Sequence, residues 1–115
     1  MTRSLTLKLM QTTFLLAVTS CFALPAQGQS AVEKLYKSKC AICHAADGSG
    51  NVPAGKSLQV RDFRSAEVQK LTDAQLFEII AKGKKAMPGY EKDLKEAQIK
   101  EMVAYIRELA KVKKK

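Results

Sequence analysis

Hydrophobic residues recur at helical spacing in three stretches of the chain, and nowhere do they alternate with polar residues as in a half-buried strand. The first stretch begins at Ser30, which has a Glu three residues later as in a capping box, and runs to about Cys43. The second begins at Thr72, with the same capping pattern, and ends before Gly83, a typical C-terminal cap. The third covers residues 96–111, and its apolar residues fit one helical face: Ile99, Met102, Val103, Ile106, Leu109 and Ala110. The pattern predicts an all-α fold with three main helices.

Turn-forming residues separate these helices. Residues 47–55, Asp-Gly-Ser-Gly-Asn-Val-Pro-Ala-Gly, predict a loop throughout. Residues 84–90, Lys-Lys-Ala-Met-Pro-Gly-Tyr, predict a second loop. Between the two loops, residues 61–70 can form a short helical turn, and the three lysines at 113–115 predict a solvated tail.

The beginning of the chain has the pattern of a secretory signal peptide. Arg3 and Lys8 are its only charged residues, an apolar run covers residues 14–24, and small residues follow. The run is shorter than the ~20 residues that a membrane-spanning helix needs. A core helix is disfavoured because no polar face recurs at helical spacing. We therefore predict a signal peptide over residues 1–28 and one domain over residues 29–115.

A second interpretation of the same segment involves Cys21. The sequence Val-Thr-Ser-Cys that ends at Cys21 resembles a bacterial lipoprotein box, in which this cysteine would carry a lipid. The chain would then be anchored to a membrane rather than released. Either interpretation predicts an exported, periplasmic protein of bacterial type.

Composition narrows the possible sites. The chain has 20 Lys and Arg against 11 Asp and Glu, one His and three Cys. Removing residues 1–28 takes away two basic residues and no acidic one, which lowers the net charge from +9 to +7. These counts exclude sites with two histidines, a disulfide-dense scaffold and a multi-domain enzyme. A domain of this size is stabilised only marginally by its own side chains, so a bound group can be needed to complete the core.

The candidate chemistry lies in the sequence Cys40-Ala-Ile-Cys43-His44. Two thiols three positions apart lie on one face of a helical turn, with an imidazole directly after them. This is the pattern that attaches haem through two thioether bonds and offers a histidine to the iron. A zinc site lacks a fourth ligand, since no further Cys or His is available after the signal segment. A thioredoxin-like redox pair would need a sheet, and a disulfide across so short a loop would constrain the unfolded chain little.

A haem iron held by His44 would need a second ligand from another residue type. With no second His in the chain, the alternatives are Met, Lys, Tyr, an amine or water. Met102 lies within the apolar face of the last helix, which indicates core packing. Met87 lies in a loop, and the following Pro88 favours an extended backbone that projects the thioether outward. We therefore predict His44 and Met87 as the axial iron ligands.

Four segments in order resemble the class I monohaem c-type cytochromes. They are the Cys40–His44 motif, the glycine loop 47–50, residues 85–90 and residues 99–107. The resemblance covers essentially all of residues 30–110 and implies an all-α cytochrome c fold wrapped around one covalently attached haem c. It also implies that Tyr36 and Tyr105 lie near the crossing of the first and last helices. The loop carbonyl of Pro53 would accept a hydrogen bond from His44.

Such a site predicts an electron carrier rather than an enzyme. The iron of a haem attached through Cys40 and Cys43, with His44 and Met87 as its two axial ligands, would exchange single electrons between periplasmic redox partners. The positive charge predicts partners with acidic docking surfaces, with Lys56, Lys82, Lys84, Lys85 and Lys92 as candidates for the basic rim. We expect a monomer that does not bind nucleic acid. Two alternatives stay open: a haem subunit of a membrane-associated dehydrogenase or oxidase complex, and an enzyme or gas sensor with an exchangeable sixth ligand.

Overall fold

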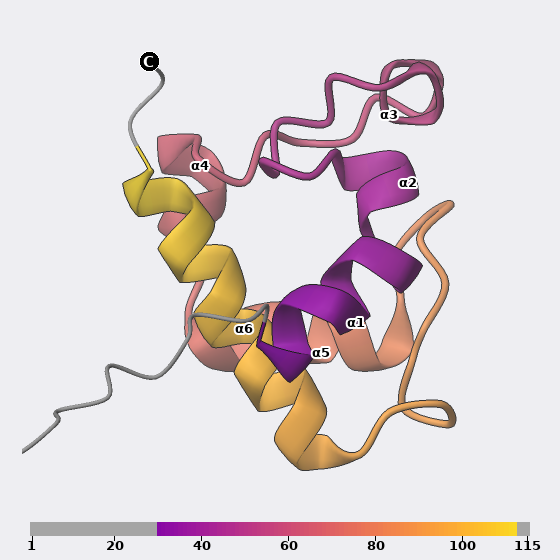
Figure 1. Cartoon of the computed structure of the whole chain (residues 1–115), viewed down its shortest axis with the longest axis vertical. Helices are drawn as coiled ribbons and strands as arrows, with labels where there is room; N and C mark the ends of the chain where they lie inside the picture. Colours follow the sequence, from indigo (N-terminus) through magenta and orange to yellow (C-terminus); the bar gives the residue numbers. More distant parts are fainter. Residues whose placement is uncertain (1–29, 113–115) are drawn as a thin grey trace, which may run out of the picture.

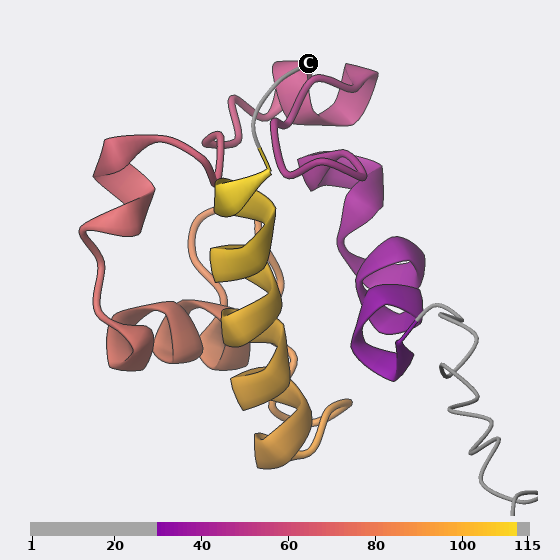
Figure 2. The same ribbon diagram turned by 60° about the vertical axis from the view of Figure 1, so that its left-hand side comes forward.

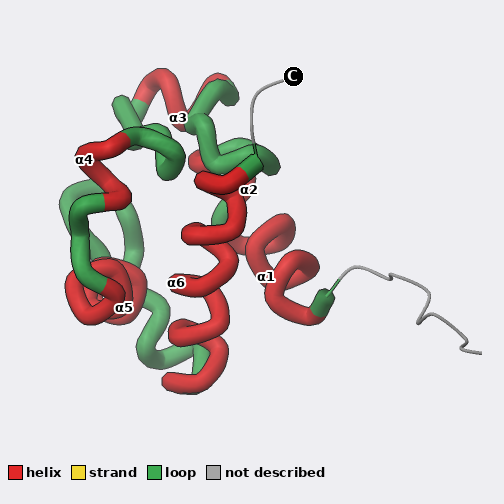
Figure 3. The backbone as a smooth tube through the Cα atoms, turned by 90° about the vertical axis from the view of Figure 1, so that its left-hand side faces the viewer, coloured by secondary structure: helices red, strands yellow, loops and turns green. Residues whose placement is uncertain are grey.

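The computed structural model describes residues 30–112, and every regular element in this range is a helix (Figures 1 and 3). The elements are α1 (Ala31–Lys39), α2 (Ala41–His44), α3 (Pro53–Ser57), α4 (Ala66–Gln69), α5 (Asp73–Lys82) and α6 (Glu96–Lys111). Within the described range the only β-type pairing is one isolated bridge, so the prediction of an all-α fold is confirmed. The predicted signal peptide 1–28, Cys21 and the lysine tail 113–115 lie outside the described residues.

The first helix begins where predicted but ends earlier. The side chain of Ser30 accepts the backbone N–H of Glu33, which satisfies one free donor of the first turn. At Cys40 the backbone departs from helical geometry, with φ at −113°, and a new turn of helix, α2, starts at the next residue. The single helix predicted from Ser30 to about Cys43 is therefore wrong in this detail. The break lies at Cys40, the first residue of the Cys-His motif.

The two later long helices agree with the predicted boundaries. Thr72 and Gln75 form a reciprocal capping box at the start of α5, and Gly83 ends that helix with a φ of +79°. At the start of α6 the Gln98 side chain accepts the backbone N–H of Lys95. This bond partly compensates for the poor capping ability of a lysine at that position.

Residues 53–55, predicted as part of a loop, are helical. Pro53 occupies the first turn of α3, where its missing N–H costs nothing and its fixed φ suits a helix. The predicted helical turn within residues 61–70 is confirmed as α4, which is capped by the Ser65 hydroxyl.

The core forms where α6 packs against both α1 and α5 (Figures 1 and 2). Tyr36, Ile99 and Met102 are its most deeply buried side chains, which confirms Met102 as a core residue. The rings of Tyr36 and Tyr105 meet between α1 and α6 with centroids 5.2 Å apart, as the resemblance implied.

Arg107 ties α6 to the segment between α4 and α5. Its guanidinium donates to the carbonyl oxygens of Gln69 and Leu71, the latter at 2.6 Å, and to the carboxylate of Asp73 at 2.8 Å. One planar group thus satisfies chain carbonyls that no helix pairs. The contacts of Arg107 therefore hold the start of α5, the helix whose C-terminal end leads into the Met87 loop.

None of the helices within residues 30–112 combines the length and the apolar character needed to cross a lipid bilayer.

Candidate cofactor site

The Cys-His motif occupies one short turn of helix. Cys40 follows the last residue of α1, and Cys43 and His44 end α2. Both thiols are free and partly exposed. Burial raises the pKa of the Cys40 thiol to about 11, and the neighbouring Cys43 adds to this effect against the opposing influence of Lys39. The structure therefore brings together the three motif residues that the sequence identified.

The imidazole of His44 is held by stacking rather than by hydrogen bonds. Its ring lies against the ring of Phe63, with centroids 4.4 Å apart and planes inclined by 23°. Its Nδ1 is buried and has no hydrogen-bond partner within the part of the chain that the structure describes, and burial lowers the pKa of the imidazole. The expected hydrogen bond from His44 to the carbonyl of Pro53 does not form in the structure, and Pro53 lies in the first turn of α3 rather than in an open loop. Phe63 was missed from the sequence, since nothing in a single aromatic residue indicates its partner across the fold.

Backbone contacts fix the turn that carries His44. The Tyr36 hydroxyl donates to the carbonyl of Ala45 at 2.7 Å, and Ala45 has a φ of +63°. The amide of Gly50 donates to the carbonyl of His44 at 2.8 Å. At Gly55 of α3, a Cβ would lie 2.3 Å from the carbonyl oxygens of both Cys43 and Gly50. Only glycine therefore allows α3 to approach the motif this closely.

Met87 lies in a tight reverse turn after α5. The amides of Lys84 and Met87 each donate to the other's carbonyl, at 3.1 and 3.0 Å, and Lys85 between them has a φ of +54°. At Gly83 a Cβ would lie 2.5 Å from the Met87 carbonyl. The side chain of Met87 is half-buried against the core. The predicted loop is confirmed, and its backbone is closely constrained on both sides of Met87.

Tyr90 joins this loop to the Cys-His motif. Its hydroxyl donates to the carbonyl of Lys39 at 3.2 Å, directly before Cys40. Burial raises the pKa of Tyr90, and the nearby Cys40 and Cys43 contribute to the rise. Figure 1 shows the loop after α5 running beside α1 and α2. The contact brings together segments 51 residues apart along the chain, which the sequence pattern alone did not reveal.

The arginines near the site are engaged with carboxylates. Arg64 forms two short hydrogen bonds with Asp62, at 2.8 and 2.9 Å, and lies 3.6 Å from Asp47. Arg61 pairs with Glu67 at 3.2 Å. Among the candidate rim lysines, Lys82 pairs with Glu78, and all five have exposed side chains.

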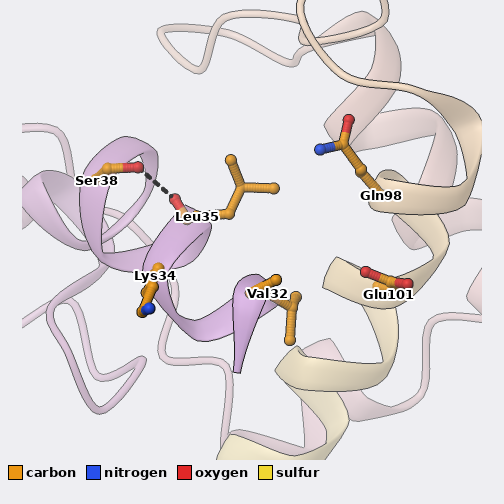
Figure 4. Close-up of a pocket in the computed structure, with 7 residues that line it drawn as sticks. Val32, Lys34, Leu35, Ser38, Gln98 and Glu101 are labelled. Carbon is orange, nitrogen blue, oxygen red and sulfur yellow. Dashed lines mark hydrogen bonds between the residues drawn. The ribbon is translucent and has the colours of Figure 1, made fainter. Parts of the chain in front are cut away.

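A groove of about 400 Å³ lies between α1 and α6, apart from the motif (Figure 4). Val32 and Leu35 face it from α1, and Gln98 and Glu101 face it from α6. None of the residues that line it belongs to the Cys-His turn or to the Met87 loop.

The donor set fits haem c better than the alternatives. Two free thiols and an imidazole with an unpartnered buried nitrogen lie on one turn. Within residues 30–112 no group of three or more His, Cys, Asp or Glu residues can hold a metal ion, which removes support for a zinc site. The described range also has no sheet beneath the cysteines, as a thioredoxin-like pair would require. The helical fold and this donor set together define a small monohaem c-type cytochrome.

Comparison with known proteins agrees with this class. The family profile described as "Cytochrome C oxidase, cbb3-type, subunit III" matches residues 27–106. A "Cytochrome c6-like" protein of Nostoc sp. (strain PCC 7120 / SAG 25.82 / UTEX 2576) is 31% identical over 106 residues, covering 90% of this chain and 92% of the relative. The "Cytochrome c6" of the same organism is 34% identical over 93 residues, covering 76% of this chain and 78% of the relative.

A solved structure, "KustC0563 c-type cytochrome", has a TM-score of 0.63 and 32% identity, covering 69% of this chain and 96% of its own. The chain belongs to the cytochrome c family that the matching profile represents. It is a haem-based electron carrier with covalently bound haem c, and its partners are redox proteins.

Proposed function

We propose that this chain is a diffusible one-electron carrier whose single haem c is attached through Cys40 and Cys43, with iron held by His44 and Met87. The observation that carries this proposal is the Cys-His turn itself. It presents two free thiols and an imidazole whose buried nitrogen has no hydrogen-bond partner among residues 30–112. When bound, the haem supplies the change of charge by one electron. The protein attaches it, orients it and excludes water from it.

The constrained Met87 turn supports the second iron ligand. Paired backbone bonds and the close approach of Gly83 hold the backbone from which the Met87 side chain projects. Pre-organisation of this kind lets the iron change charge with little rearrangement of the chain. A soft thioether also stabilises reduced iron and raises the reduction potential. With His44 and Met87 both holding the iron, no position would remain open for a substrate, so we propose a carrier rather than an enzyme.

The test is a pair of methionine variants in protein matured with haem. Met87→Ala should keep the haem attached and lose the weak sulfur-to-iron absorption band of the oxidised protein. Its reduced form should bind carbon monoxide at neutral pH. Met102→Leu, which changes a buried core methionine of α6, should keep the band and exclude carbon monoxide. Retention of the band in Met87→Ala would overturn Met87 as the iron ligand. Carbon monoxide binding by the unaltered protein would support the sensor or enzyme alternative.

We further propose that the carrier is exported to the periplasm as a monomer after removal of residues 1–28. The intact mass of the exported protein should equal residues 29–115 plus one haem. A chain that begins at Cys21 with attached lipid would show membrane anchoring instead.

Exposed lysines beside the site support docking to acidic redox partners. Lys84 and Lys85 lie in the Met87 turn. Ile42, between the two cysteines, is 73% exposed and offers an apolar contact to a partner. We expect Lys84→Glu to slow electron transfer to an acidic partner, most strongly at low salt. Lys70→Glu, at the end of α4, is the charge-matched control and should have a smaller effect. Equal effects of the two variants would contradict a localised docking surface.

A second candidate function is that of a haem subunit in a membrane-associated oxidase or dehydrogenase complex. The description of the matching family profile, an oxidase subunit, favours it. Copurification with larger subunits under mild extraction would support this function. Recovery as a free monomer with reversible one-electron cycling would support the carrier.

A further inference from the structure

The two halves of the proposed haem site lie on separate elements. The cysteines and His44 belong to the turn that follows α1, whereas Met87 belongs to the loop that follows α5. Figure 1 shows this loop running beside α1 and α2. Within the described part of the chain, one hydrogen bond joins residues 83–95 to residues 30–50: the Tyr90 hydroxyl donates to the Lys39 carbonyl at 3.2 Å.

The break in the helix at Cys40 leaves the Lys39 carbonyl available for this bond. In a continuous helix that carbonyl would accept the amide of Cys43. The amides of Cys43 and His44 instead both donate to the carbonyl of Cys40, at 3.2 and 3.0 Å. The Lys39 carbonyl accepts the Tyr90 hydroxyl in their place. The helix break therefore provides the acceptor on the side of the cysteines.

The donor is anchored on the side of the methionine. The Tyr90 amide donates to the carbonyl of Ile80, in the last turn of α5, at 3.0 Å. A Cβ on Gly89 would lie 2.7 Å from the Ala81 carbonyl oxygen, so the chain just before Tyr90 lies directly against the same turn. The Tyr90 ring is half-buried and packs against the core. The backbone of Tyr90 thus belongs to the α5 side, and its side chain reaches across to α1.

We propose that Tyr90 is a positioning residue for the second iron ligand: the bond from its hydroxyl to the Lys39 carbonyl holds the Met87 loop against the turn that carries the two cysteines. The inference rests on the proposed ligation of iron by Met87. Tyr90 lies three residues after Met87, and the carbonyl that it binds lies directly before Cys40. A movement of the loop away from the cysteines breaks this bond, so the bond opposes loss of the thioether from the iron.

The experiment measures how tightly free imidazole binds to the oxidised, haem-loaded protein in place of the Met87 sulfur. Imidazole reaches the iron only when the loop opens, so its apparent affinity rises with the fraction of open loop. Tyr90→Phe keeps the ring and removes the donor. It should raise the apparent affinity about two- to fivefold, because a neutral hydrogen bond at a half-buried position contributes toward the lower end of its usual range. On heating, this variant should also lose the sulfur-to-iron absorption band at a lower temperature than the unaltered protein.

Two further tyrosine variants separate positioning from general destabilisation. Tyr105→Phe removes the hydroxyl of another half-buried ring and should change neither the imidazole affinity nor the loss of the band. Tyr36→Phe removes the hydroxyl that donates to the Ala45 carbonyl, on the His44 side of the site. It should lower the free energy of unfolding but raise the imidazole affinity less than Tyr90→Phe does. A merely structural role for Tyr90 predicts instead that the imidazole affinity follows the free energy of unfolding across the three variants.

The outcomes distinguish this inference from the proposed function. If Tyr90→Phe has the band and the imidazole affinity of Tyr105→Phe, the positioning role is overturned while Met87 remains a ligand. An equal rise in affinity for Tyr36→Phe and Tyr90→Phe would also overturn it. Absence of the sulfur-to-iron band from the unaltered protein would instead overturn the proposed ligation by Met87.

Discussion

The hydroxyl of Tyr36 offers a sharp test of how the fold supports the Cys-His turn. Tyr36 is fully buried, and its hydroxyl donates to the carbonyl of Ala45, the residue directly after His44. Phenylalanine in its place keeps the ring packing against Phe63 and Tyr105 but removes the donor. Ala45 is itself only 6% exposed, so water cannot easily replace the lost partner.

The expected cost follows from that burial. A buried carbonyl left without its donor costs about 1–3 kcal/mol. For a domain of this size, each kcal/mol lowers the melting temperature by about 4–8 °C. Tyr36→Phe should therefore lower the urea-derived free energy of unfolding by about 1–3 kcal/mol. Tyr105→Phe is the matched control, because the Tyr105 hydroxyl forms no hydrogen bond in the structure, and its loss should cost less than about 0.5 kcal/mol.

The same residue predicts a pH dependence with a definite sign. Burial raises the pKa of Tyr36 well above its usual range, and the nearby Cys40 adds to this. The folded state therefore holds the phenolic proton after the unfolded chain has lost it, and stability falls as pH rises above the unfolded pKa of about 10. At pH 11 the slope from this group should be about 1.2 kcal/mol per pH unit, and Tyr36→Phe should lack that component. The reasoning would be refuted if Tyr36→Phe were as stable as Tyr105→Phe and kept the full fall of stability with pH above 10.

Three further perturbations test other parts of the structure. Gly55→Ala should lower the free energy of unfolding in urea by about 2–4 kcal/mol, because a Cβ there would meet two carbonyl oxygens at 2.3 Å. Ser57→Ala, at an exposed position of the same helix, is the control and should change this free energy little. Arg107→Lys should lower the free energy of unfolding by about 1–3 kcal/mol because a lysine cannot reach several carbonyls at once. Asp73→Asn should lower it by less than about 1 kcal/mol because the Asp73 carboxylate is 77% exposed. Equal losses in the two variants would contradict the larger role given to the bonds with the carbonyls. Residues 29–115 carrying Cys43→Ser and no haem should be poorly folded. Iodoacetamide should therefore alkylate the Cys40 thiol of this variant as fast as it alkylates a peptide thiol. An alkylation rate about 100-fold lower at pH 8 would show that the fold that protects Cys40 forms without the haem.

The sequence was sufficient wherever the signal was local. The helix that follows Thr72 and the helix over residues 96–111 were predicted because caps and apolar periodicity lie within a few residues of each other. The Cys-His motif was found for the same reason: two thioether bonds and one iron ligand need fixed short spacing. Met87 was selected by elimination, since composition left few residues able to face a second iron position.

Tertiary structure decided everything that depends on which segments meet. The break at Cys40 was not evident from the helical pattern, and a loop-like composition concealed the helix begun by Pro53 and its close approach to α2. The stacking of Phe63 on His44 and the bond from Tyr90 to Lys39 join residues 19 and 51 positions apart. The sequence determined the chemistry of the site and the helices that carry it, because both are encoded in neighbouring residues. Only the folded chain decided which side chains pack against the histidine, because those side chains come into contact only on folding.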